Sequence, residues 1–185
     1  KVMLRWSALI NEHAEELALL ETMNCGKPIS DSLNVDVASC SNNIQWYGET
    51  IDKLYGEIAP IPRDSVALIE REPMGVVGAV VPWNYPLIIT SWKVGAALAA
   101  GNSVVLKPAE QSPLSALLFA ELGAQAGLPD GVLNVIPGFG PTAGGALGKH
   151  MDVQKLAFTG STEVGRYFLK YAAESNAKAV SLELG

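Results

Sequence analysis

The sequence predicts an α/β fold: an open, parallel, five-stranded Rossmann-like sheet with helices on both faces. Short apolar runs rich in β-branched residues recur along residues 76–184, and segments with helical periodicity fill the gaps between them. Nearly continuous apolar runs are typical of strands that are covered on both faces. A regular alternation of strand and helix implies a parallel sheet joined by right-handed crossovers.

The expected strands and helices follow from these runs. Strands are predicted at residues 76–81, 103–106, 132–136, 155–158 and 179–184, with helices at 87–100, 114–126, 142–149 and 162–174. For the helix over 114–126 we expect Ser112 as N-cap and Pro113 at the first helical position. Its apolar stripe is predicted to comprise Leu114, Leu117, Leu118 and Leu122.

The first 72 residues do not show this alternation of strand and helix. Residues 4–20 and 32–50 are predicted helices, and 57–62 and 66–72 are predicted extended segments. Because an isolated extended pair is marginally stable, we expect it to pair with another part of the protein or another subunit. The organisation is therefore a helical part over 1–56, an extended segment over 57–72 and an α/β domain over 73–185. Both ends are expected to be cuts through a longer protein, because a helix begins almost at once and the chain stops after an apolar run.

Composition narrows the class of function. A hydrophobic content of 49% with 17% charged residues fits a globular protein, and a net charge of −6 argues against a nucleic-acid partner. The longest apolar stretch, 87–100, is shorter than the roughly 20 residues of a membrane span and contains Lys93. Two cysteines and two histidines make a disulfide scaffold or a zinc site unexpected and favour free thiols in a reducing cytoplasm.

Ligands of open parallel sheets bind where strands lead into helices, and the first such loop is residues 81–86. Two prolines fix the turn and hold Asn84 between aromatic residues. An amide held rigidly there can donate a hydrogen bond to an oxyanion that forms on a substrate carbonyl. The alternative interpretation is an aromatic-proline turn with a capping asparagine.

Two further loops suggest a nucleotide. Lys107 and Glu110 flank a turn after the second strand and can serve as donor and acceptor for a ribose diol; the alternative is a solvated charge pair. After the fourth strand, Gly160 permits close approach of a ligand to the backbone. Free amides and the positive helix end near Ser161 favour a pyrophosphate, with helix capping alone as the alternative.

The loop over residues 138–144 fits the dinucleotide pattern G-x-G-x-x-G/A only weakly, through Gly138, Gly140 and Ala143. Pro141 removes one amide, so we interpret this loop as a tight turn beside an adenine. In the last strand, Glu183 stands between leucines. Burial would raise the pKa of such a carboxylate toward that of a general base, and the alternative is a glutamate on the solvent face of an edge strand.

Taken together, these motifs resemble the aldehyde dehydrogenase superfamily over residues 1–185, most specifically from Pro73 onward. The segments that carry the resemblance are Pro82-Trp83-Asn84-Tyr85-Pro86, Lys107-Pro108-Ala109-Glu110, Phe158-Thr159-Gly160-Ser161 and Leu182-Glu183-Leu184-Gly185. The family's full chain is several hundred residues, so this chain would be its inner N-terminal portion. The resemblance implies the family's NAD-binding domain.

The resemblance also implies roles for individual residues. Asn84 corresponds to the oxyanion-stabilising asparagine, Glu183 to the general base, and Lys93, next to Trp92, to a lysine near the substrate tunnel. The residues implied in cofactor binding are Pro82, Trp83, Lys107, Glu110, Gly140, Phe158, Gly160 and Ser161.

The implied reaction begins when a cysteine thiolate adds to the aldehyde, giving a thiohemiacetal. Hydride transfer to the nicotinamide leaves a thioester, which a water activated by Glu183 hydrolyses to the carboxylic acid. The resemblance implies that the nucleophilic cysteine lies beyond Gly185. Cys25 and Cys40 fall in no matching motif, so neither is expected to be the nucleophile.

The sequence also bears on the choice of cofactor, the substrate and the assembly of the protein. Glu110 at the ribose favours NAD over NADP, because a carboxylate repels a 2′-phosphate. Residues 24–28 and 46–47 look most like the branch that acts on aminoaldehydes, betaine aldehyde and γ-glutamylaminobutyraldehyde. The extended segment corresponds to the family's oligomerisation arm and implies a homodimer or homotetramer.

Two alternatives remain open. One is a non-catalytic nucleotide-binding relative. The other is a reductive or acylating member of the superfamily, which often lacks the glutamate that Glu183 provides.

Overall fold

The computed structural model describes residues 1–185 and is built on a parallel five-stranded sheet of order β5-β4-β3-β6-β7. The prediction of an α/β fold with this sheet is confirmed. The strands are β3 (Val76–Val80), β4 (Ser103–Lys107), β5 (Leu133–Val135), β6 (Lys155–Thr159) and β7 (Ala179–Glu183). The chain runs outward from β3 to β5, then returns to β6 beside β3. The strand order therefore reverses between β3 and β6, which is where ligands of such sheets bind.

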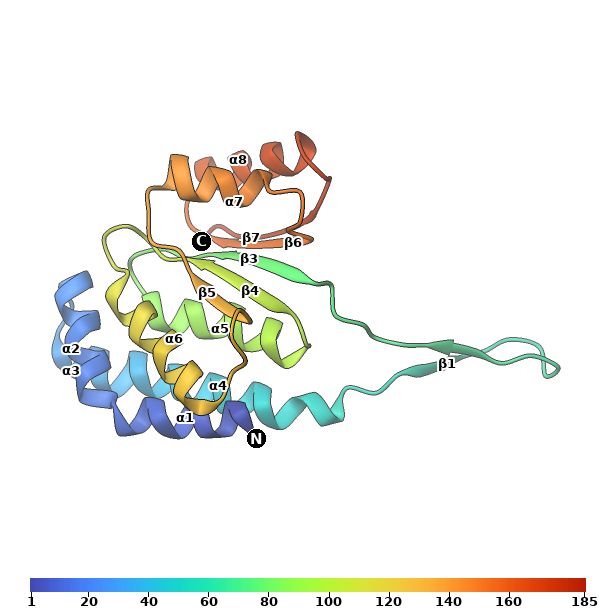
Figure 1. Cartoon of the computed structure of the whole chain (residues 1–185), viewed down its shortest axis with the longest axis horizontal. Helices are drawn as coiled ribbons and strands as arrows, with labels where there is room; N and C mark the ends of the chain where they lie inside the picture. The colour runs from blue at the N-terminus through green and yellow to red at the C-terminus, as the bar shows by residue number, and fades with distance from the viewer.

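Helices cover both faces of the sheet (Figure 1). On one face lie α5 (Pro86–Ala99) and α6 (Leu114–Ala126). On the other lie α7 (Gly145–Lys149), which follows a π-helical turn η3 (Gly140–Gly144), and α8 (Thr162–Ala173). After the C-cap Ala100 of α5, Gly101 adopts a positive φ of 82°, which turns the chain toward β4.

The N-terminal helices form a further layer over α5 and α6 (Figure 1). The single helix predicted over 4–20 is wrong: α1 (Val2–Glu12) and α2 (Ala14–Cys25) meet at a turn on His13. The helix predicted over 32–50 is longer than expected. It comprises α3 (Ile29–Asp31), a π-helical stretch η1 (Ser32–Val37) and α4 (Ala38–Thr50), and a 3₁₀ turn η2 (Ile51–Lys53) follows.

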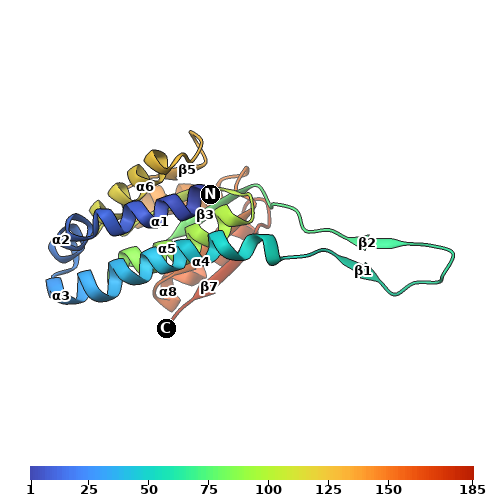
Figure 2. The same cartoon turned by 90° about the horizontal axis from the view of Figure 1, so that it is seen from below.

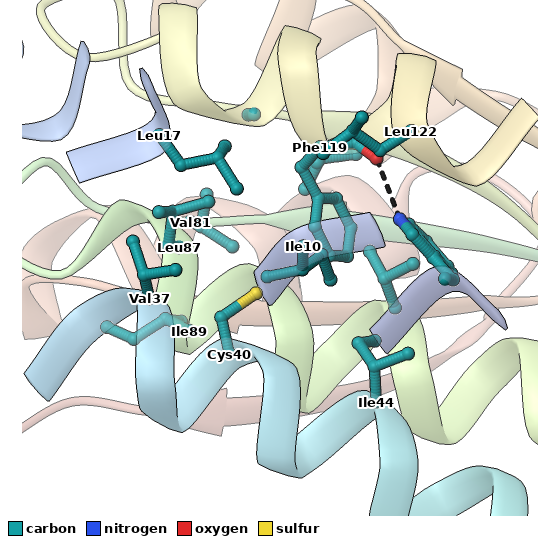
Figure 3. Close-up of a cluster of buried hydrophobic side chains, with 14 of the residues drawn as sticks. Ile10, Leu17, Val37, Cys40, Ile44, Val81, Leu87, Ile89, Phe119 and Leu122 are labelled. Atoms are coloured by element: carbon teal, nitrogen blue, oxygen red, sulfur yellow. Dashed lines mark hydrogen bonds between the residues drawn. The ribbon is translucent and has the colours of Figure 1, made fainter. Parts of the chain in front are cut away.

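The main hydrophobic core lies between the sheet, α5, α6 and these N-terminal helices (Figure 3). Trp6 is fully buried there, and its indole nitrogen donates to the carbonyl of Phe119 at 2.9 Å, the bond drawn in Figure 3. The core thus joins segments that are far apart in the sequence. A smaller core under α7 and α8 contains Val80, Leu147, Val153, Leu156, Phe158 and Phe168.

The apolar stripe and the cap predicted for α6 need correction. Leu114 and Leu117 are each 40% exposed, whereas Phe119 and Leu122 are fully buried together with small residues. The buried hydroxyl of Ser112 has no hydrogen-bond partner and does not cap the helix. The first-turn amide of Leu114 instead donates to Asn24 Oδ1 at 2.9 Å, so tertiary contact with α2 replaces the local cap.

The predicted extended segments form a two-stranded antiparallel hairpin, β1 (Glu57–Ala59) and β2 (Ala67–Ile69), in which Ile58 lies opposite Leu68. The hairpin projects away from the body of the molecule (Figure 2). Ile58 is 74% exposed and Leu68 63%. Within this chain the strands pair only with each other, and pairing with another part of the complete protein or with another subunit stays a prediction. None of the helices combines the length and apolar character that crossing a bilayer requires.

Candidate functional site

A cavity of about 640 Å³ opens at the carboxyl ends of β3, β4 and β6, where the strand order reverses. It brings together every residue that the sequence implied in cofactor binding. These are Pro82 and Trp83 after β3, Lys107 and Glu110 after β4, Gly140 in η3, and Phe158, Gly160 and Ser161 around the end of β6.

Lys107 and Glu110 form an ion pair on the wall of this cavity. The Lys107 side chain is 3% exposed, and its Nζ donates to Pro108 O at 2.8 Å and to Glu110 Oε2 at 3.2 Å. The pKa of Glu110 is lowered by a hydrogen bond from its own backbone and by the bond from Lys107. A buried ammonium needs such partners, and the pair offers a donor and an acceptor side by side.

In the loop after β6, a ligand can approach the backbone closely. A Cβ on Gly160 would lie 2.6 Å from the Phe158 ring, so the backbone can pass there only with glycine. Ser161 is the N-cap of α8, and its Oγ accepts from Val164 N at 3.3 Å. The other first-turn amides of α8 have no intrahelical acceptor. Ser161 and Val164 line the cavity, so the positive end of the helix dipole lies at it.

The loop before α7 lines the cavity, but its backbone amides are not available to a ligand. The N–H groups of Thr142, Ala143 and Gly144 all donate to the carbonyl of Phe139. They are therefore engaged within the turn, and the weak G-x-G-x-x-G/A pattern builds no phosphate cradle. Gly140 lines the cavity, and a Cβ there would meet open space.

Asn84 lies beside a second cavity, of about 310 Å³, that faces α2 and η1. Trp83 lines both cavities and so separates them. Asn84 is exposed, its Oδ1 accepts from Tyr85 N at 3.1 Å, and its Nδ2 makes no hydrogen bond within the chain. Tyr85, not Asn84, is the N-cap of α5. The amide donors of Asn84 are therefore free to reach a ligand.

Glu183 is not sandwiched in a buried strand end as the sequence suggested. It is exposed at the end of the edge strand β7, on the face opposite to Leu182, which packs against the smaller core. Lys93 on α5 is half-buried; burial lowers the pKa of its ammonium and the charge of Glu183 opposes that shift. Neither residue lines either cavity.

Known proteins share both the sequence pattern and the arrangement of this chain. The profile described as "Aldehyde dehydrogenase family" matches all of residues 1–185. The chain belongs to the aldehyde dehydrogenase family. It is 56% identical over 184 residues to the NADP/NAD-dependent aldehyde dehydrogenase PuuC of Escherichia coli strain K12, a match that covers 100% of the chain and 37% of the relative. It is 52% identical to an aminoacetaldehyde dehydrogenase of Pseudomonas aeruginosa, covering 99% and 37% respectively.

Solved structures of the family agree closely with this one. The aldehyde dehydrogenase KauB from Pseudomonas aeruginosa matches with a TM-score of 0.99 at 56% identity, over 100% of this chain and 37% of that one. An indole-3-acetaldehyde dehydrogenase in complex with NAD⁺ matches with a TM-score of 0.98 at 55% identity and the same coverage. The chain thus spans little more than a third of the length of the relatives it matches.

In this aldehyde dehydrogenase segment, the sequence reasoning missed a polar cluster beneath the Asn84 loop. Glu21 is fully buried and accepts hydrogen bonds from Leu87 N at 3.1 Å and Ser115 Oγ at 2.5 Å. Lys27 Nζ contacts buried Asp36 Oδ2 at 2.5 Å. The available signal was a glutamate four positions after Leu17, on the face of α2 that is otherwise apolar.

Proposed function

We propose that the complete protein is an NAD(P)-dependent aldehyde dehydrogenase that oxidises an aldehyde to a carboxylic acid, and that residues 73–185 form its cofactor-binding domain. The observation that carries the proposal is the single cavity at the reversal of the strand order, which collects all the residues implied in cofactor binding. Membership of the aldehyde dehydrogenase family supports the same reaction class.

The residues present suit a dinucleotide. The Lys107–Glu110 pair can bind a ribose diol, because a charged donor and acceptor lie within 3.2 Å of each other at the rim. The start of α8, with Gly160 and Ser161, can receive a pyrophosphate on backbone amides. When bound, the nicotinamide accepts the hydride that the oxidation releases.

Three residues outside the cofactor cavity would serve the chemistry. The free Nδ2 of Asn84 would donate to the oxyanion that forms when the nucleophile of the complete protein adds to the carbonyl. Glu183, exposed at its strand end, would take a proton from the water that hydrolyses the thioester. Lys93 would stabilise the carboxylate of Glu183 by its positive charge.

The proposed cofactor preference is for NAD, since the Glu110 carboxylate would repel a 2′-phosphate. The name of the relative from E. coli includes both cofactors, so NADP is the second candidate. Test assays should therefore include both.

For the substrate we propose an aminoaldehyde, with betaine aldehyde as a further candidate. An aminoacetaldehyde dehydrogenase and the structure of a γ-glutamyl-γ-aminobutyraldehyde dehydrogenase from Burkholderia cenocepacia are among the similar proteins. The cavity beside Asn84 is also lined by Asp31 and Asp36. Lys27 neutralises Asp36, whereas Asp31 has no basic partner and suits a cationic substrate.

The proposal also covers the assembly of the protein and its location in the cell. The exposed apolar hairpin β1–β2 supports a homodimer or homotetramer in which a neighbouring subunit covers it. The free thiols of Cys25 and Cys40 support a reducing, cytoplasmic location.

The experiment is an assay of the complete protein with a panel of aldehydes, with either NAD or NADP. We expect NADH and a carboxylic acid in equal amounts, fastest with aminoaldehydes. Cofactor binding without any aldehyde-dependent reduction would favour the alternative, a non-catalytic nucleotide-binding relative.

A further inference from the structure

We propose that Glu21 and Cys25, which lie on one face of α2, are positioning residues that hold Asn84 in place for oxyanion stabilisation. The inference rests on the proposed function, because it assigns these residues a role through Asn84. Neither side chain is proposed to touch the substrate.

The loop that carries Asn84 has almost no hydrogen bonds of its own. Residues 82–84 make no backbone–backbone hydrogen bond, and the strand ladder stops at Val81, whose N–H donates to Lys107 O. Within the loop, only Tyr85 N bonds to Asn84 Oδ1. A segment with so few bonds keeps a fixed geometry only if other elements hold it.

Helix α2 supplies the contacts that the loop lacks. Cys25 Sγ donates to the carbonyl of Trp83 at 3.0 Å, the only hydrogen bond between residues 82–84 and another part of the chain. Burial raises the pKa of Cys25 to about 11, so its thiol keeps the proton that it donates. The residue directly before Asn84 is thereby fixed.

Glu21 fixes the other side of Asn84. Its Oε1 accepts from the N–H of Leu87, in the first turn of α5, at 3.1 Å. Its Oε2 accepts from Ser115 Oγ at 2.5 Å, which ties the same carboxylate to α6. Glu21 and Cys25 are four residues apart and so lie one turn above the other on α2. Their hydrogen-bond partners, Trp83 and Leu87, lie on either side of Asn84 in the chain.

A third contact strengthens this assignment. Lys27 Nζ lies 4.3 Å from the centroid of the Tyr85 ring and pairs with buried Asp36. Trp83, Tyr85 and Leu87 are thus each held by α2 or the turn after it. Because a fully buried carboxylate such as Glu21 is costly compared with an apolar residue of similar size, its place on this face points to a positioning role.

The test is a double-mutant cycle in the complete protein. Glu21→Ala and Cys25→Ala are each made in the wild-type and in the Asn84→Ala background, and the rate of the pre-steady-state burst of NADH is measured. We expect each to slow the burst about tenfold in the wild-type background, because a misplaced donor stabilises the oxyanion less. In the Asn84→Ala background we expect no further loss, and KM for NAD should not change.

Conservative variants and a control separate positioning from a general loss of stability. Cys25→Ser and Glu21→Gln keep a hydrogen-bonding group in place and should restore the burst rate to within about twofold. Lys178→Met removes buried bonds to Gly148 O and Ser175 Oγ near the opposite ends of the strands, and it should leave the burst rate unchanged. If Glu21→Ala does not fold, the Cys25→Ala and Cys25→Ser pair decides the matter.

Equal losses in both backgrounds, or a burst that neither alanine variant slows, would overturn the positioning role while leaving the proposed function intact. A different result would undermine the proposed function itself: an Asn84→Ala variant with a normal burst would remove the role on which the positioning depends.

Discussion

Glu183, at the end of β7, acts on Lys93 of α5 through its negative charge. Burial lowers the pKa of the Lys93 ammonium, and the charge of Glu183 opposes that lowering. Both residues were expected in the chemistry from the sequence, and they come from segments far apart in the chain. Substitution of Glu183 therefore tests the hydrolytic half of the proposed reaction directly.

Glu183→Gln should abolish steady-state turnover while the first burst of NADH survives. The amide cannot take a proton from water, so the thioester forms but is not hydrolysed. We expect kcat to fall by about a hundredfold or more. Stopped-flow measurement of NADH separates the burst from the steady state.

The control for this variant is Glu15→Gln, which removes an exposed carboxylate from α2 far from the sheet edge. It should behave like the wild type. Steady turnover by the Glu183 variant at the wild-type rate would refute the role of general base.

Glu110→Gln should weaken the preference for NAD. Removing the negative charge takes away the repulsion of a 2′-phosphate and one acceptor for the ribose, so KM for NADP should fall and KM for NAD should rise, each by about tenfold. Steady-state kinetics with both cofactors measure the ratio. If the ratio of kcat/KM values for the two cofactors did not move, Glu110 would not face the ribose.

Gly160→Ala should disturb the cofactor cavity and Gly140→Ala should not affect folding. A Cβ at Gly160 would lie 2.6 Å from the Phe158 ring, whereas a Cβ at Gly140 meets nothing within 4 Å. We expect Gly160→Ala to cost about 1–3 kcal/mol in the free energy of unfolding and to weaken NAD binding. Gly140→Ala should stay within about 0.5 kcal/mol of the wild type. Denaturant titration and calorimetric titration with NAD test the pair; equal stabilities would contradict the crowding at Gly160.

The pH dependence of stability should reveal Glu21. Burial raises its pKa above the ordinary value of 4.5, against the hydrogen bonds from Ser115 and Leu87. The folded protein therefore keeps a proton that the unfolded chain releases, and this contribution to stability is lost as the pH rises from near 4.5 through the folded-state pKa. Glu21→Gln removes that loss.

We therefore expect the melting temperature of Glu21→Gln, relative to that of the wild type, to be higher at pH 8 than at pH 4.5. Melting curves of both proteins across this range provide the measurement. A constant difference would mean that the carboxyl titrates at its ordinary pKa.

Charge on the hairpin β1–β2 should reduce the size of the assembly. Ile58 and Leu68 are opposite each other, exposed and apolar, so replacing both with lysine would place two charges where a neighbouring subunit is expected. Analytical ultracentrifugation of the complete protein should show a smaller species. Ser65→Lys, at the tip of the hairpin, serves as the control. An unchanged assembly of the double variant would show that the hairpin is not part of the interface.

The fold was predictable from local pattern because each strand is a short apolar run between clear turn signals. Strand order was not, since nothing local in β6 says that it returns to the side of β3. The cap of α6 was misjudged for a similar reason. Ser112 is a suitable local cap, but Asn24 from α2 satisfies the amide of Leu114.

The cavity lined by residues 82–83, 107, 109–110 and 158–161 could be predicted as a set of loops, because parallel strands carry their carboxyl ends to one edge. Its role in binding a cofactor stays a proposal. The surroundings of Asn84 were not foreseen. Glu21 and Cys25 on α2, and Lys27 in the turn after it, reach the loop from a different layer, and only tertiary packing reveals that contact. For Glu183 the sequence left a buried and an exposed position open, and the choice depended on which strand lies at the edge.

The most direct test of the central claim is whether the complete protein reduces NAD in the presence of an aldehyde, and whether Lys107→Met and Glu110→Gln weaken that cofactor's binding. We expect stoichiometric NADH and carboxylic acid from an aminoaldehyde, and a rise of about tenfold or more in the Kd for NAD for Lys107→Met. An absence of NAD reduction with every aldehyde tested, together with unaltered NAD binding by both variants, would contradict it.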